Sequence, residues 1–358
     1  MVPTIVIYVL TVFLCTFIAE RADKRNNWIL LMWAVLLASC VAGFRGVGVG
    51  NDTAGYYRMF ATHGMWGFIR EPVFRYYIQI LMDIFENAHV CIFFTSLITQ
   101  FFFFAGFWKL RFFCSLSSLV FSYMVIPYFL TFSGLRQWLS LSLVMFAIPE
   151  LLKGKYGKYI FIVVVATSIH YSSILALSYI YILFLVSRKN KKTIKDYALR
   201  FLFIVLGITT VVIASPLYMN EYSYLISDIS MIERGGALMS IYRYIIVFIA
   251  FVQIQEIRKK LSCLKENELV NYQVLLVSFI GFFLWTSIAW FGQYYLNIAR
   301  IGWVFLLCQG LLYSNYFRKK TQLARLTNFA ILIILLYSFF SLLSSAESQP
   351  YIPFWMES

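Results

Sequence analysis

Long apolar runs separated by short basic clusters restrict what this chain can fold into. Of its 358 residues, 61% are hydrophobic and only 13% carry a charged side chain, whereas about a quarter of the residues of a soluble domain are charged. Apolar runs of about 18 or more residues have the length that a helix needs to cross a bilayer. The sequence therefore predicts an all-α, polytopic integral membrane protein, with a single transmembrane domain over residues 1–358 and no soluble domain.

The basic clusters between the apolar runs give the expected topology, because cytoplasmic loops of membrane proteins carry an excess of lysine and arginine. With the N-terminus outside, we predict about twelve membrane-crossing segments, two of which form a hairpin of short helices. The single crossings are 2–19, 28–44, 90–108, 112–131, 138–152, 198–216, 241–257, 270–291, 298–317 and 327–345. The longest extracytoplasmic loops are then about 45–89 and 216–240.

The hairpin is predicted for residues 159–187, which have lysines before them and a strongly basic cluster after them. One straight helix of this length would reach about 43 Å at 1.5 Å per residue, whereas the hydrocarbon core is about 30 Å thick. Two short helices with a bend near residues 168–173 satisfy both the length and the charges at the two ends. His170 then lies toward the outer half of the membrane.

A further helix, about 66–88, is expected to be interfacial or re-entrant. Its residues include several charged side chains, and each charge at a membrane centre costs about 2.5–3.5 kcal/mol. Pro72 is favourable at the first turn of such a helix.

Arginine and lysine divide unequally between the two sides of this topology. All 14 lysines lie in or beside the predicted cytoplasmic loops, whereas the basic residues assigned elsewhere are all arginines. They are Arg45, Arg58, Arg70, Arg75, Arg136, Arg234, Arg243 and Arg300. Because guanidinium forms bidentate hydrogen bonds with phosphate, this split predicts phosphate recognition outside. For Arg70, Arg75, Arg234 and Arg243, tolerance of the interface and pairing with nearby acidic residues is an equal alternative.

Two ionisable residues are candidates for acid–base chemistry. Asp52 follows a glycine-rich segment and is either a general base or the N-cap of a helix. Aspartate is common in both roles. His170 lies in a serine- and tyrosine-rich patch inside an apolar run. Intramembrane ionisable residues are functional candidates by default, although a lone histidine is often a satisfied core group.

Other chemistries lack their motifs. Gly46, Gly48 and Gly50 follow no predicted strand and precede no P-loop lysine, so they are not a nucleotide loop. No serine-hydrolase motif occurs. The net charge of +14 is spread over loop clusters, which favours membrane topology over a nucleic-acid partner. The three histidines and the scattered cysteines have no metal-ligand spacing, so we expect no metal and no cofactor. The cysteines are Cys15, Cys40, Cys91, Cys114, Cys263 and Cys308.

Several short motifs resemble those of the EpsG-like, Wzy-type polysaccharide polymerases. In chain order they are Phe44-Arg45 with Gly50-Asn51-Asp52-Thr53-x-x-Tyr56, Glu71-Pro72, Gly134-Leu135-Arg136-Gln137-Trp138-Leu139-Ser140, Ala166-x-x-x-His170-x-Ser172, and Arg300 before an aromatic-rich span. Ser140 stands where the family usually has alanine. The motifs cover most of the first half of the chain and only thinly the second.

The resemblance implies a glycosyltransferase that polymerises lipid-linked oligosaccharide repeat units for O-antigen lipopolysaccharide, capsule or exopolysaccharide. Donor and acceptor would each be carried by a polyprenyl diphosphate such as undecaprenyl diphosphate, in the bacterial inner (cytoplasmic) membrane. The active face would be extracytoplasmic, which is periplasmic in a Gram-negative cell. Membrane lipids, and a chain-length regulator, are partners that the resemblance allows.

Roles for individual residues follow from the resemblance. It implies that Asp52, His170 and Arg136 are catalytic, with Asp52 or His170 as the base. Diphosphate and sugar would be bound by Arg45, Arg300, Gln137, Thr53, Tyr56 and Tyr57.

Two other functions share these features. A flippase or other transporter of the same lipid-linked units also needs arginines and a polar interior, but would favour charges along a central pathway and an internal repeat. A related transferase, either an O-antigen ligase or a membrane acyltransferase, is the second alternative.

Overall fold

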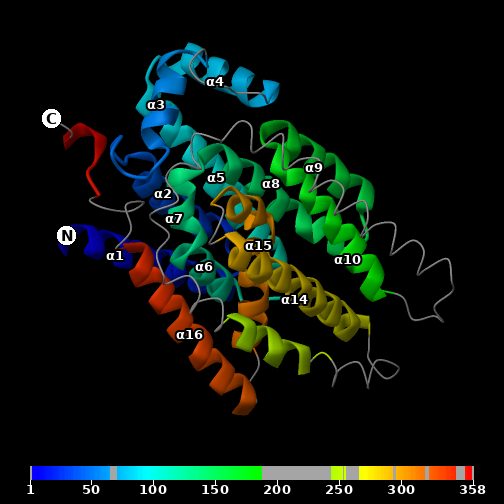
Figure 1. The fold of residues 1–358 in the computed structure, drawn as a ribbon. Coiled ribbons are helices and arrows are strands. Elements are labelled where there is room, and N and C mark those ends of the chain that lie inside the picture. Colours follow the sequence, from blue (N-terminus) through cyan, green and yellow to red (C-terminus); the bar gives the residue numbers. More distant parts are fainter. Residues whose placement is uncertain are drawn as a thin grey trace.

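A computed structural model describes residues 2–64, 71–187, 243–252, 254, 266–292, 296–318, 322–343 and 351–356. Within these residues the regular structure is helical, and the one β-type pairing is an isolated bridge between Arg45 and Pro353 (Figure 1). The helices are α1 (Val2–Lys24), α2 (Trp28–Gly43), α3 (Thr53–Ala61), α4 (Pro72–Phe85), α5 (Ala88–Leu110), α6 (Leu116–Val125), α7 (Pro127–Ser133), α8 (Leu135–Leu152), α9 (Tyr156–Ile169), η1 (Tyr171–Leu177), α10 (Ser178–Ser187), α14 (Glu266–Gly292), α15 (Leu296–Arg318), α16 (Gln322–Leu343) and η4 (Phe354–Met356). A further apolar helix is Arg243–Val252.

The all-helical membrane architecture is confirmed, but the number of crossings is not. Four of the described helices are long and apolar enough to cross a membrane, or five when the bent pair α6–α7 counts as one span. The expected crossing at 198–216 and the loop at 216–240 lie outside the described residues. The total of about twelve crossings therefore stays a prediction.

The centre of the bundle is formed by α5 and α8. These two helices pack against each other, α2 packs on α5, and α9 packs on α8, while α14 pairs with α15 and α15 reaches α6. Nearly all of α8 is buried. Because neighbours surround it, the first turn of α8 is a rigid support for the side chains that it carries.

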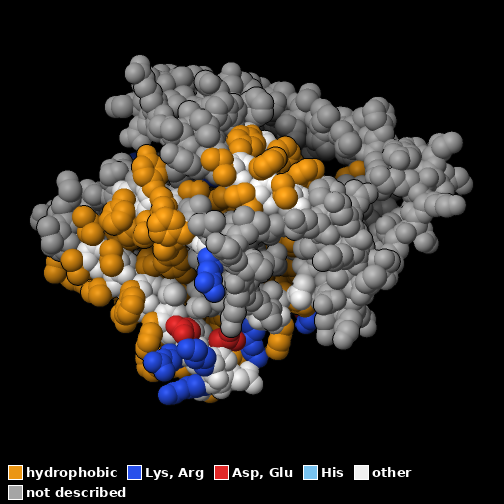
Figure 2. All heavy atoms as spheres, turned by 90° about the horizontal axis from the view of Figure 1, so that it is seen from below, with side chains coloured by type: hydrophobic (Ala, Val, Ile, Leu, Met, Phe, Trp, Pro, Cys, Tyr) orange, Lys and Arg blue, Asp and Glu red, His pale blue; other side chains and the backbone are white. Residues whose placement is uncertain are grey.

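Hydrophobic side chains also cover much of the outside. On α1, Leu10 and Phe13 are 50% and 62% exposed, and on α16 Phe329 is 65% exposed. Figure 2 shows a face on which the described side chains are mainly hydrophobic, with lysine, arginine and acidic side chains gathered at one edge. Extended apolar surfaces of this kind mark contact with a membrane or with another protein.

Three of the predicted cytoplasmic connections lie at the same end of the bundle, which we call the lysine-rich end. Arg111 after α5 donates to the Asn26 side chain at 2.6 Å, in the turn between α1 and α2. Lys109 and Lys158 each lie 3.6 Å from Glu150, which joins the ends of α5 and α8 to the start of α9.

The predicted crossing at 112–131 contains a bend. Its helices α6 and α7 meet at an angle of 42°. Pro127 opens α7, and proline both lacks an N–H donor and disfavours helical backbone in the residue before it. Ile126 accordingly leaves the helical conformation, with φ −128° and ψ −66°. The bend places the end of α7 beside the loop that follows α2.

The hairpin in residues 159–187 is present, with its bend inside the predicted interval. α9 ends at Ile169, His170 has extended backbone, and the second arm begins as η1 before α10. The Tyr159 hydroxyl donates to the Ala176 carbonyl at 2.6 Å, which ties the two arms together.

α4 lies across the end of the bundle opposite to α16 in Figure 1 and begins at Pro72, as predicted. One face is buried and includes Phe74 and Ile78. The other face exposes Tyr76 and Ile80 by 65% and 57%. This exposed face also carries the charged Arg75 and Asp83. Such a mixture of apolar and charged side chains suits a membrane interface, and this location for α4 stays a prediction.

Candidate functional site

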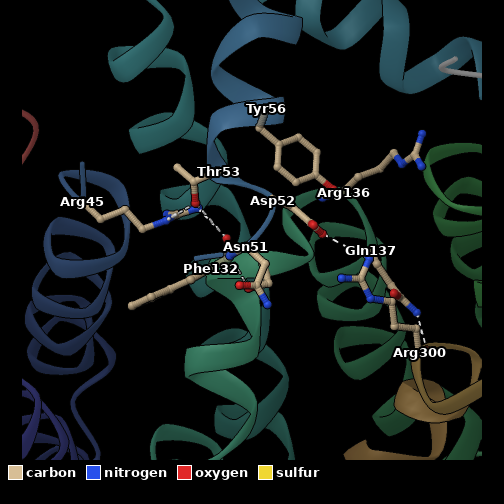
Figure 3. A network of polar contacts seen from close by, with 10 residues as sticks. Arg45, Asn51, Asp52, Thr53, Tyr56, Phe132, Arg136, Gln137 and Arg300 are labelled. Atoms are coloured by element: carbon tan, nitrogen blue, oxygen red, sulfur yellow. Dashed lines mark hydrogen bonds and ion pairs between the residues drawn. The ribbon is translucent and has the colours of Figure 1, made fainter. Parts of the chain in front are cut away.

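Arg45 lies inside the protein, with only 1% of its surface exposed. Its guanidinium donates to the Thr53 hydroxyl and to the Phe132 carbonyl, both at 3.1 Å, and also to the Ala42 carbonyl (Figure 3). Burial lowers the pKa of Arg45 to about 10, so the side chain keeps its charge at neutral pH. The sequence predicted a diphosphate ligand, whereas the structure uses Arg45 to tie α2, the following loop and α7 together.

The loop after Arg45 is fixed on the end of α7. The Thr53 hydroxyl lies 3.1 Å from the Phe132 carbonyl, and the Asn51 amide donates to the Ser133 hydroxyl at 3.1 Å. Gly50 has φ +88°, and a Cβ there would lie 2.8 Å from the Phe132 carbonyl oxygen. Thr53 is 1% exposed. It therefore belongs to this scaffold, although the sequence placed it among the substrate ligands.

Asp52 occupies the N-cap position of α3, but its side chain makes no capping hydrogen bond. Its Oδ2 lies instead 3.2 Å from a terminal guanidinium nitrogen of Arg300, with side chains 32% and 27% exposed (Figure 3). Of the two alternatives for Asp52, capping is therefore not the role of its carboxylate. The ion pair joins α3 to α15 at a surface that solvent reaches.

A second ion pair joins the start of α8 to the start of α4. Arg136 donates to Glu71 at 2.8 Å, with side chains 15% and 5% exposed. The backbone amide of Arg136 also donates to the Tyr56 hydroxyl at 3.4 Å. Tyr56 is 8% exposed, so it mainly supports the start of α8. Glu71 was not among the predicted site residues, although the Glu71-Pro72 pair marked its position.

Gln137 lies at the centre of a hydrogen-bonded chain that reaches His170. Its amide nitrogen donates to the Arg300 carbonyl at 2.7 Å and to the Ser172 hydroxyl at 3.2 Å. Ser172 in turn lies 2.8 Å from Nδ1 of His170. Ser172, which sequence reasoning did not name as a site residue, stands two positions after His170 in the motif that carries both.

The charges around His170 favour its neutral form. His170 lies in the turn between α9 and η1 and outside both helices. The positive charges of Arg136 and Arg300 both act on its ring and oppose the addition of a further positive charge there. The same two arginines act on Tyr56. Both arginines are thus within electrostatic range of one small region.

The structure brings together most, but not all, of the predicted site. We call the following residues the polar cluster: Asp52, Glu71, Arg136, Gln137, His170 and Arg300. Arg45 and Thr53 are buried in the scaffold beside it. Tyr57 packs on His89, with ring centroids 4.7 Å apart, and His89 stacks on Phe354. Tyr57 therefore supports the packing of the C-terminal segment, and the sequence had expected it to contact sugar.

A metal centre is not apparent in the described part of the chain. It contains no group of three or more histidine, cysteine, aspartate or glutamate side chains placed to hold an ion. The cysteines within it are free.

A comparison with known protein families identifies the family of this chain. A model of the EpsG family matches residues 28–356. The chain belongs to the EpsG family. This is a family of Wzy-like polysaccharide polymerases, and the resemblance found in the motifs is thereby confirmed. No curated protein and no solved structure matches the chain.

The EpsG match reaches well beyond the motifs of the first half. It begins with α2 and continues through α16 to η4, so it includes Arg300 and the segment 351–356. Both ion pairs of the polar cluster therefore lie within the part of the chain that the family model covers.

Proposed function

We propose that this EpsG-family protein joins oligosaccharide repeat units that are linked to polyprenyl diphosphate, at the extracytoplasmic face of the inner membrane. The observation that carries the proposal is the pair Arg136 and Arg300. The two arginines lie on different helices, each is paired with a carboxylate, and both act electrostatically on His170 and Tyr56. Two guanidinium groups at the end of an apolar bundle fit a ligand with a diphosphate head and a lipid tail.

The Asp52–Arg300 ion pair is suited to exchange its carboxylate for a phosphate. The Asp52–Arg300 pair is about one-third exposed, and exposed ion pairs contribute only about 0–1 kcal/mol. A diphosphate offers more acceptor oxygens and more negative charge than one carboxylate. Its binding to Arg300 would therefore release Asp52. The more buried Arg136–Glu71 pair would hold Arg136 in place for the second phosphate.

The reaction is a transfer of the growing glycan. A hydroxyl oxygen of the acceptor repeat forms a bond to the anomeric carbon of the donor, and the bond from that carbon to the diphosphate oxygen breaks. The diphosphate leaves with the electron pair and is stabilised by Arg136 and Arg300. The hydroxyl proton passes to Asp52, which is then free of its arginine. The group that accepts this proton supplies about 10²–10⁴-fold of rate in comparable enzymes.

Gln137 and Tyr56 take supporting roles in this proposal. The amide nitrogen of Gln137 already donates to two protein oxygens, and the Tyr56 hydroxyl accepts from the start of α8. They therefore hold the arginines and the histidine in place, and direct contact with sugar falls to other groups.

A flippase and a ligase remain the competing functions, and a deletion strain separates them. Loss of a polymerase leaves surface glycan with a single repeat on its lipid core. Loss of a flippase or a ligase removes the surface glycan altogether. The position of the arginines at one end of the bundle, and not along its length, favours a transferase.

Complementation of that strain tests the assignment of residues. We expect Arg136→Ala and Arg300→Ala each to reduce chain growth at least about tenfold, as loss of a charge-assisted hydrogen bond of about 1.5–3 kcal/mol requires. Arg75→Ala is the matched control, because Arg75 is an exposed arginine on α4 outside the polar cluster. The proposal would be refuted if Arg136→Ala and Arg300→Ala, at equal protein levels, both gave glycans of wild-type length.

A further inference from the structure

The hydrogen-bonded chain through Gln137 has a fixed direction, because backbone groups determine the roles at both of its ends. The Arg300 carbonyl can only accept, so the Gln137 atom 2.7 Å from it is the amide nitrogen. The second hydrogen of that nitrogen points to the Ser172 hydroxyl at 3.2 Å. Ser172 Oγ therefore accepts from Gln137 and has its own hydrogen left to donate.

The other end of the chain is at Nδ1 of His170. The Ser172 hydroxyl lies 2.8 Å from this atom. The backbone amide of Ser172, which can only donate, also points to it at 3.4 Å. The backbone contact requires Nδ1 to be an acceptor, and the contact at 2.8 Å is then a hydrogen bond that the Ser172 hydroxyl donates. In neutral imidazole one ring nitrogen accepts and the other carries the hydrogen. The hydrogen of His170 is therefore on Nε2.

A protonated imidazole does not fit this arrangement. It would place a hydrogen on Nδ1, opposite the backbone N–H of Ser172. The two cationic arginines of the cluster oppose the added charge, as does burial of the ring. No other acidic group than Asp52 and Glu71 belongs to the cluster, and each is already paired with an arginine.

We propose that Ser172 and Gln137 hold His170 in the Nε2–H form, so that His170 donates a hydrogen bond to the departing diphosphate and does not act as the base. This assignment rests on the proposed polymerase function. Nε2 has no hydrogen-bond partner among the described residues, and both arginines that would bind the diphosphate act on the ring. His170 is the catalytic donor in this account, and Ser172 and Gln137 are positioning residues.

Two substitutions of His170 separate a donor from a base. Glutamine places an amide N–H at about the distance of Nε2, and an amide cannot take up the proton. We expect His170→Gln to retain chain growth within about tenfold of the wild type, and His170→Ala to lose at least about a hundredfold, as measured with purified protein in lipid nanodiscs and synthetic lipid-linked repeats. If His170 is the base, both variants lose activity equally, by about 10²–10⁴-fold.

The tautomer itself is measurable without activity. The chain has three histidines, so the ¹⁵N signals of His170 can be assigned by comparison with His170→Gln. We expect an unprotonated Nδ1 and a protonated Nε2 in the wild type and in Ser172→Thr, and a shifted Nδ1 signal in Ser172→Ala, which loses the hydroxyl hydrogen bond and keeps the backbone amide. Ser168→Ala is the matched control, because its hydroxyl bonds to the Val165 carbonyl within α9 and not to the ring.

The two measurements keep the two proposals apart. A wild-type protein that does not extend glycans contradicts the proposed function, and the ¹⁵N spectra still decide the tautomer. A hydrogen on Nδ1 in the wild type, or an unchanged spectrum in Ser172→Ala, overturns the inference about His170 even when polymerisation is present.

Discussion

Burial separates two uses of arginine in this protein. Arg45 is enclosed and donates to one hydroxyl and two backbone carbonyls. Arg136 and Arg300 are partly exposed and are paired with carboxylates. All three lie close to a helix end, so their sequence settings look alike. The residue type predicted a phosphate ligand at each position, but only packing decides which guanidinium remains accessible.

Loss of Arg45 should therefore unfold the protein more easily. Arg45→Ala leaves the Phe132 carbonyl without its guanidinium donor in a buried place, and each such group costs about 1–3 kcal/mol. We expect Arg45→Ala to lower the midpoint of thermal unfolding in detergent, as measured by tryptophan fluorescence. Arg300→Ala should keep the wild-type midpoint. An Arg45→Ala protein of unchanged stability that fails to bind the lipid-linked substrate would restore Arg45 as a ligand.

The polar cluster itself was largely predictable from residue types and their order. Asp52, Arg136, Gln137, His170 and Arg300 were all named from the sequence, and the structure brings them together. The cluster was easier to predict than the role of Arg45, because ionisable side chains in an apolar chain occur only at the few places where they find a partner. Which direction a small polar side chain such as Thr53 points is not encoded in such a pattern.

At the scale of elements, tryptophan packing connects the two helices that carry the arginines of the polar cluster, α8 and α15. Trp138 on α8 and Trp303 on α15 have ring centroids 5.3 Å apart, and the Arg300 guanidinium lies 5.8 Å from the Trp303 ring. Gly134 provides the space, since a Cβ there would lie 2.8 Å from the Trp303 side chain. The position of Arg300 therefore depends on a residue at the start of another helix.

Gly134→Ala should disturb this connection. We expect the alanine to displace Trp303 and to lower the free energy of unfolding by about 1–3 kcal/mol, as in other overpacked cores. Chain growth should also fall under conditions in which the variant is still folded. Gly157→Ala is a suitable control, since a Cβ at Gly157 meets no atom within 4 Å. The test is chain growth measured at a temperature where both variants are folded. Equal activity in the two variants would show that Arg300 does not need the Trp303 contact.

The helices were predictable where hydrophobic run length or a terminating residue determined them. The start of α4 at Pro72 and the break near His170 followed from proline placement and from the excess length of the run. The bend between α6 and α7 was missed because that segment was judged by its hydrophobicity alone. Pro127 marked the break, and the restriction of Ile126 before a proline was sufficient to predict it.

At the scale of the whole molecule, the two ends of the bundle differ in their basic residues. The connections after α1, α5 and α8 meet at the lysine-rich end. The polar cluster uses arginine and gathers the loop after α2, the start of α8, the hairpin turn and α15. Positive-inside bias supports a cytoplasmic lysine-rich end, and the proposed polymerase then acts outside.

Cysteine labelling in cells tests this orientation. In a cysteine-free background, Arg58→Cys on α3 should react with a membrane-impermeant thiol reagent added outside intact cells, after the outer membrane is opened where one is present. Lys155→Cys before α9 should react only when the inner membrane is also permeabilised. Both positions are exposed. The reverse labelling pattern would place the polar cluster in the cytoplasm.

The most direct test of the polymerase proposal is the stoichiometry of the transfer. Purified protein in lipid nanodiscs, supplied with one synthetic polyprenyl-diphosphate-linked repeat unit, should yield a ladder of glycans that grows by whole repeats. Each added repeat should release one free polyprenyl diphosphate, and Arg136→Ala should diminish both products together, whereas Arg75→Ala should not. Repeat units that remain single and lipid-linked under these conditions, with the wild-type protein folded, would contradict the account.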